Sequence, residues 1–275
     1  MQGKRILDLY RDGALLGHRG ASAVTAMKAG LSEGLAASLP SVWEGRLCAA
    51  LARMFPGYPS VRIFSSRARA LAALSLSEDP WDPALAGADA ATAIAPAAAP
   101  SPRGTGVPVR PEGRTAAPNP RGTAALWRPF LPAPAGARVL LPVLPLTMCG
   151  APAPALAAPD HSAALPESDH LPGFLLAGAL HALAALSSSS PKRPAPRLGN
   201  PILEKAVDGA RGWARTGPYV RAVFPAAQYP RVHAEFLRAG VLLCPTWPGP
   251  SILPGECSSG ENRLLADLFA GHPGG

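Results

Sequence analysis

The chain has 275 residues, 34 of them proline and 28 glycine, with a formal net charge of +8. Its basic residues are scattered, without a long block of like charges or interleaved aromatic residues, so we expect no nucleic-acid-binding surface. The four cysteines lie far apart without a Cys-x-x-Cys motif, which predicts reduced thiols, no metal site and a cytoplasmic protein.

Residues 1–76 predict a strand, a loop, two helices, a further strand and a third helix. The first helix is expected to follow Ser22, a residue type that suits the N-cap position. Its apolar residues recur at helical spacing and are expected in the core. They are Val24, Met27, Leu31 and Leu35.

The second helix of this segment is amphipathic and is expected to end at Pro56-Gly57. A short apolar strand, residues 61–64, then runs directly into a helix of small residues. The turn between them contains no glycine. The apolar face of the second helix comprises Trp43, Leu47, Leu51 and Met54.

Residues 77–199 carry few signals of order, and residues 84–136 are rich in Ala, Pro, Gly and Arg without a period, which predicts a linker. The stretch RVLLPVLPLTMC predicts an edge or irregular strand, because Pro142 and Pro145 cannot donate to a ladder. The stretch GFLLAGALHALAAL predicts a buried helix that is too short to span a membrane.

Residues 200–275 regain clear local signals. Asn200 and Pro201 suit the start of a helix, and Gly240 suits the end of a later one. Ser258 and Glu261 predict a capping box before a last helix. With short strands between these helices, the segment predicts an α+β sandwich with its helices on one face.

Two stretches at the start, GKRILDLYRDGALLGHRGASAVTAMKAGLSEGL and LPSVWEGRLCAALARMFPGYPSVRIFSS, resemble the opening of class-III aminotransferases. The stretch VHAEFLRAGVLLCPTWPGPSILPGECSSGENRLLADLF resembles the C-terminal domain of the same family. Glutamate-1-semialdehyde aminomutases, which are fold-type-I pyridoxal-phosphate enzymes, are closest in pattern. The resemblance implies an α/β fold with a reduced large-domain sheet and a C-terminal α+β sandwich.

The family's phosphate-binding turn reads Asn-Ser-Gly-Thr-Glu-Ala, and the resemblance places Ser65, Ser66, Arg67 and Arg69 at this turn. Here Arg67 replaces the glycine, Ala68 the threonine and Arg69 the acid. Arginine attracts phosphate by charge, but a long side chain prevents the close backbone approach that glycine allows. We therefore expect a degenerate turn.

The family's chemistry needs a lysine that forms a Schiff base with the cofactor, and an aspartate beside the pyridinium nitrogen. None of Lys4, Lys28, Lys192 and Lys205 follows a strand into a glycine-rich turn, and Lys205 is the least unsuitable. No apolar strand ends in Asp-Glu, and Asp160 and Asp169 are expected in loops.

Three interpretations are open. The favoured one is a non-catalytic aminotransferase-like protein, a pseudoenzyme, with no covalently bound pyridoxal phosphate. The second is an active pyridoxal-phosphate-dependent aminotransferase or aminomutase with an atypical lysine, and the third is a decayed or structural protein. The resemblance also implies a homodimer, or association with a related aminotransferase.

Overall fold

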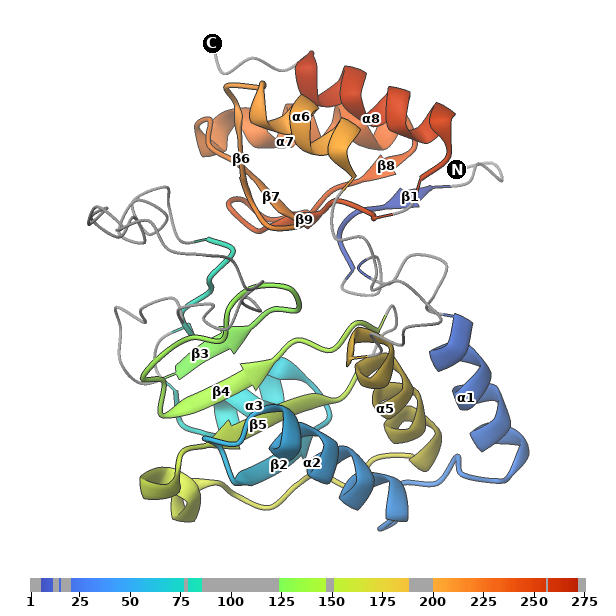
Figure 1. Ribbon diagram of the computed structural model, residues 1–275, viewed down its shortest axis with the longest axis vertical. Coiled ribbons are helices and arrows are strands. Elements are labelled where there is room, and N and C mark those ends of the chain that lie inside the picture. The colour runs from blue at the N-terminus through green and yellow to red at the C-terminus, as the bar shows by residue number, and fades with distance from the viewer. Residues whose placement is uncertain are drawn as a thin grey trace, which may run out of the picture.

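The computed structural model describes residues 6–11, 15, 21–76, 79–85, 124–146, 151–187, 200–255 and 257–271. The elements form two units, one above the other in Figure 1. The main-sheet unit comprises the described residues from 21 to 187. The C-terminal unit comprises the described residues from 200 to 271 together with β1 (Leu7–Asp8).

The main-sheet unit is built on a sheet of strand order β2-β5-β4-β3. Strand β5 is antiparallel to both its neighbours, whereas β3 and β4 are parallel, so β2, β4 and β3 all run in one direction. Their carboxyl ends therefore meet at one edge of the sheet. The strands are β2 (Ser60–Phe64), β3 (Ala124–Trp127), β4 (Val139–Pro142) and β5 (Ala153–Ala157).

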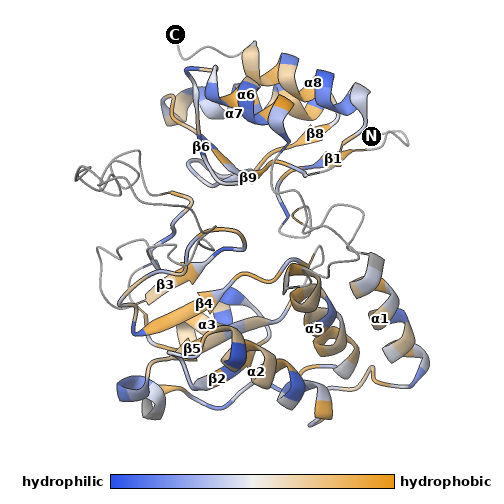
Figure 2. Ribbon diagram, viewed as in Figure 1, coloured by the Kyte–Doolittle hydropathy of each residue, from blue (hydrophilic) through white to orange (hydrophobic). Residues whose placement is uncertain are grey.

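Both faces of this sheet are covered. Ile63, Leu140 and Leu156 pack beneath α2 (Val42–Met54) and α5 (Gly173–Ser187). The alternate residues, among them Phe64, Leu141 and Ala155, pack on the other face with α3 (Arg67–Ala73). Successive side chains of a strand point to opposite faces, which explains the split. Figure 2 shows the resulting hydrophobic character of β3 and β4.

Two predictions for the middle of the chain are wrong. Strand β3 lies inside the predicted linker 84–136, because pairing with β4 and with the main chain of Trp81 buries its alanines. Strand β4 is not an edge strand. Its Pro142 occupies the last position, and Val143 rather than Pro142 donates a hydrogen bond to Trp127 O at 2.9 Å. Residues 86–123 of the predicted linker lie outside the described part of the chain.

Helix α2 confirms its prediction, since Leu47 and Leu51 are fully buried and Phe55 is its C-cap, directly before Pro56. Helix α1 (Ala21–Ser32) differs from the prediction, because it starts at Ala21 and Ser22 is therefore inside it.

The predicted core stripe of α1 is also wrong in part, because Val24 and Leu31 are exposed. The helix instead approaches α5 through smaller residues. Met27 lies against Gly178, and Gly30 lies against the backbone of Phe174. Glycine at these two positions allows the helices to lie close together.

Helix α5 confirms the predicted apolar helix, and its His181 is exposed. None of the helices in the described ranges combines the length and the apolar character that crossing a bilayer requires.

The C-terminal unit places its helices on one face of short strands, as predicted (Figure 1). The strands form a sheet of order β6-β7-β9, and β8 pairs in parallel with β1 from the start of the chain. The elements are α6 (Pro201–Asp208), β6 (Trp213–Thr216), β7 (Tyr219–Ala222), α7 (Tyr229–Arg238), β8 (Val241–Leu242), β9 (Ser251–Ile252) and α8 (Ser259–Ala270).

The predicted caps of this unit are confirmed. Asn200 Oδ1 accepts from Leu203 N at 3.4 Å, and Ser258 and Glu261 form a reciprocal capping box. Gly240 has a φ of 86°, the left-handed conformation expected just after a helix. The core beneath the helices includes Trp213, in edge-to-face contact with Phe269.

Candidate functional site

A cavity of about 650 Å³ lies between the two units, at the edge where β3 ends and α3 begins. This is the position at which α/β sheets usually hold ligands, because loops that follow the strands converge there. The loop after β8 closes it from the C-terminal unit. Its wall includes Tyr10, Arg11, Arg67, Arg128, Cys244 and Trp247.

In the turn between β2 and α3, serine and backbone groups form hydrogen bonds with other groups of the same chain. Ser66 Oγ accepts from Arg69 N at 3.1 Å and caps the helix. Ser65 donates from its backbone N and from Oγ to Asp169 Oδ2, at 2.9 and 2.8 Å. The backbone N–H groups of Ser65 and Arg69 and the Ser65 hydroxyl are therefore already satisfied within the chain. Of the four predicted turn residues, Arg67 lines the cavity.

Arg69 is directed to Asp169 instead. Its Nε lies 3.3 Å from Asp169 Oδ1, and its guanidinium lies over the ring of Phe64. Partial burial raises the pKa of Asp169, but hydrogen bonds from Ser65 and the charge of Arg69 outweigh it, so the pKa is lowered. Asp169 lies in a loop as predicted, but its role in the turn was not foreseen.

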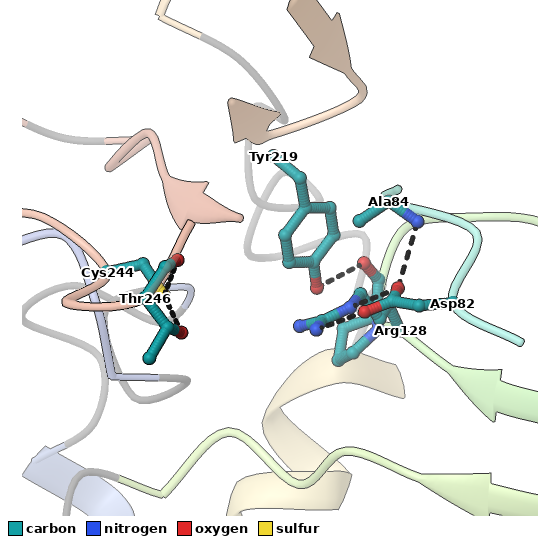
Figure 3. A network of polar contacts seen from close by, with 7 residues as sticks. Asp82, Ala84, Arg128, Tyr219, Cys244 and Thr246 are labelled. Carbon is teal, nitrogen blue, oxygen red and sulfur yellow. Dashed lines mark hydrogen bonds and ion pairs between the residues drawn. The ribbon is translucent and has the colours of Figure 1, made fainter. Parts of the chain in front are cut away.

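The residue that follows β3 is Arg128, which forms a buried ion pair with Asp82 (Figure 3). Arg128 Nε donates to Asp82 Oδ1 at 2.7 Å and Nη2 donates to Oδ2 at 2.6 Å. Asp82 Oδ1 also accepts from Ala84 N at 3.0 Å. Neither residue was predicted as part of the site, because both flank a segment in which no strand was expected.

The opposite wall carries Cys244 and Thr246 (Figure 3). Cys244 Sγ lies 3.5 Å from both Thr246 O and Thr246 Oγ1, and Cys244 O accepts from Tyr229 at 2.6 Å. Burial raises the pKa of Tyr229 well above its usual range, so its hydroxyl stays protonated. Cys48, Cys244 and Cys257 are free thiols, and Cys149 lies outside the described residues.

The lysines within the described ranges lie elsewhere. Lys28 is exposed on α1, and Lys205 is exposed on α6, where it lines a separate hollow with Ile202 and Arg211. Lys4 and Lys192 lie outside the part of the chain that is described. The same part of the chain holds no cluster of His, Cys, Asp and Glu suited to a metal ion.

Solved structures with a similar fold are pyridoxal-phosphate enzymes. A transaminase with bound PLP is 16% identical, with a TM-score of 0.58 over 97% of this chain and 85% of that one. An omega-transaminase from Sphaerobacter thermophilus is also 16% identical, with a TM-score of 0.56 over 97% and 86% of the two chains. The chain has the fold of the fold-type-I pyridoxal-phosphate enzymes.

Other neighbours extend the likeness beyond transaminases. Sphingomonas wittichii serine palmitoyltransferase is 12% identical, with a TM-score of 0.55 over 98% of this chain and 88% of that one. The predicted fold class is thus confirmed. Neither the models of known protein families nor the curated protein sequences gave a match.

The residues of the cavity do not fit pyridoxal phosphate. No lysine of the described chain lines it, and in the turn after β2 the backbone N–H groups of Ser65 and Arg69 bind Asp169 and the capping Ser66. The strands of the main sheet are followed by Ser65, Arg128, Val143 and Ala158, so none is followed by an acid. A cationic Arg128 cannot serve as the carboxylate partner of a pyridinium nitrogen.

Proposed function

We propose that this protein is a non-catalytic aminotransferase-like protein, a pseudoenzyme. One observation carries the proposal: the edge of the sheet that would hold the cofactor is occupied by the buried ion pair between Arg128 and Asp82. The covalent step of transamination requires an amine that forms a Schiff base. The described part of the cavity wall carries guanidinium, carboxylate and thiol groups. It carries no lysine amine that could form the Schiff base.

Within fold type I, we propose a relationship to class-III aminotransferases. The supporting residues are the stretches 3–35, 39–66 and 232–269, in that order along the chain. The secondary structure of these stretches supports the proposal, since β1 and α2 lie within the first two and most of α7 and α8 lies within the third.

The two other interpretations are less well supported. An active enzyme that uses Lys205 conflicts with the exposed position of that residue on α6, away from the cavity wall. The third interpretation is a decayed or structural globular protein without a catalytic role. Its disordered form conflicts with the capping box at Ser258 and with the buried, bidentate Arg128–Asp82 pair, and its globular form leaves the aminotransferase-like fold unexplained. Groups of this kind require a specific folded arrangement.

The test is covalent capture of the cofactor. Purified protein is incubated with pyridoxal phosphate, reduced with borohydride and digested for mass spectrometry, beside a Lys205→Arg variant. We expect no adduct specific to one lysine, no visible absorption band and no transaminase activity. A stoichiometric pyridoxyl adduct on one lysine, absent from the variant if that lysine is Lys205, would contradict the proposal.

We further propose that the protein self-associates through α1. Val24 and Leu31 lie seven positions apart on one face of this helix, with 45% and 48% of their surface exposed. Leu39, which precedes α2, and Val42, the first residue of α2, are also exposed, at 64% and 69%. Exposed apolar patches of this kind mark interaction surfaces.

Multi-angle light scattering tests this interface. We expect the wild-type protein to be a dimer and the double variant Val24→Glu, Leu31→Glu to be a monomer, because buried carboxylates disfavour the interface. The matched control is Ala29→Glu on an exposed position of the same helix, which should remain a dimer. A monomeric wild type, or a complex formed only with a related aminotransferase, would contradict self-association.

A further inference from the structure

The two units have separate hydrophobic cores. Trp213, Phe236 and Phe269 belong to the core of the C-terminal unit, whereas Leu140 and Leu156 belong to the cores around the main sheet. A smaller cluster joins residues of both units. It comprises Leu15, Ala84, Leu131, Tyr219 and Ile252, with Phe130 packed against it.

The Asp82–Arg128 pair lies beside this small cluster and is covered by the C-terminal unit. The side chains of Arg128 and Asp82 are only 7% and 8% exposed. The ring of Tyr219, from β7, lies 5.1 Å from the guanidinium carbon of Arg128. The Tyr219 hydroxyl donates to Pro129 O at 3.1 Å, as Figure 3 shows.

The two units also meet where Gly217 lies against the side chain of Leu131. Gly217, in the turn before β7, has a φ of 59° and lies against Leu131. A methyl group at Gly217 would come within 2.8 Å of Leu131 Cδ2. The positive φ therefore favours glycine at this position, and a methyl group there would force the Leu131 side chain to move.

We propose that Asp82, Arg128 and Tyr219 form a clamp that holds the C-terminal unit over the cavity and couples the unfolding of the two units. Two parallel hydrogen bonds donated by Arg128 to Asp82 fix the plane of the guanidinium, whose central carbon lies over the Tyr219 ring. Such a buried ion pair contributes little net stability but favours the single arrangement in which both charges are satisfied.

Loss of the Tyr219 ring would expose the ion pair to water and leave the other members of the small apolar cluster as the link between the units in this region. Each unit has a core of its own and can then open at its own free energy, as cooperative parts of proteins do. The clamp does not depend on the proposed loss of catalysis, because it involves no cofactor.

Hydrogen exchange followed by mass spectrometry at increasing urea tests the clamp. Peptides covering residues 60–64 and 219–222 report on the main-sheet unit and the C-terminal unit. We expect one common midpoint in the wild type and two midpoints, about 0.5 M urea or more apart, in Tyr219→Leu and in the double variant Asp82→Asn, Arg128→Met. The double variant avoids an unpaired buried charge that could prevent folding.

Two variants serve as controls. Tyr219→Phe keeps the ring on Arg128 and should keep a common midpoint. Arg215→Met removes an ion pair with Asp208 inside the C-terminal unit and should also keep the coupling. Separate midpoints in the wild type, or a common midpoint in both clamp variants, would overturn the proposal.

Discussion

Replacing Phe236 by alanine will lower the free energy of unfolding by about 3–5 kcal/mol, as large-to-small substitutions at buried aromatic positions do. Phe236 is fully buried on α7, with ring centroids of Trp213 and Phe269 at 5.7 and 5.3 Å. The substitution removes these contacts and leaves a cavity beneath the helices of the C-terminal unit. Because whole domains are stable by only about 5–15 kcal/mol, this is a large share of the total.

Urea unfolding followed by tryptophan fluorescence measures this loss, since Trp213 adjoins the cavity that forms. Val223→Ala is the matched control, because Val223 belongs to the same unit and is 44% exposed. Its effect should stay within about 0.5 kcal/mol. A loss below about 1 kcal/mol for Phe236→Ala would show that this core is not the one described.

The Cys48 thiol will react with iodoacetamide at least about 10-fold more slowly at pH 8 than a thiol of ordinary pKa, because a smaller thiolate fraction outweighs the greater nucleophilicity of that thiolate. Burial is the main cause and the charge of Glu44 adds to it, and together they raise the pKa of Cys48 from 9.0 to about 11. The thiolate is the reactive form, so a rise of two pKa units lowers its fraction about 100-fold.

The same shift predicts how stability depends on pH. Between pH 9 and about 11 the unfolded chain loses the Cys48 proton while the folded chain retains it, so stability falls as the pH rises through this range.

Alkylation resolved by peptide mapping gives the rate for Cys48 alone. Glu44→Gln should speed the reaction, because it removes the Glu44 charge, the smaller of the two causes that raise the Cys48 pKa. Alkylation of Cys48 at the rate of a free peptide would contradict the burial of its thiol.

The fold of this chain and the groups at its site give different information. The cavity lies at the sheet edge where β3 ends. The groups at that edge include the Arg128–Asp82 ion pair and Ser65, which is held by Asp169. Because function belongs to the site rather than to the fold, the shared architecture alone implies no transamination.

Much of the local structure followed from the sequence. The cap at Asn200, the capping box of Ser258 and Glu261, and the buried face of α2 at Leu47 and Leu51 were all predicted. Each depends on residues within about one helical turn of one another, so spacing along the chain equals proximity in space. The absence of glycine from residues 65–70 was also visible, because these residues lie inside one short turn.

Only the tertiary structure decided the rest. Ser65 and Asp169 are 104 positions apart, Asp82 and Arg128 are 46 apart, and Tyr219 reaches the carbonyl of Pro129 over 90 positions. No spacing in the sequence indicates which distant loops meet, because that depends on strand order and on which faces the helices cover. Strand β3 is the same case: its short alanine-containing stretch has little preference for a strand by itself, and pairing with β4 and burial of both faces make it one.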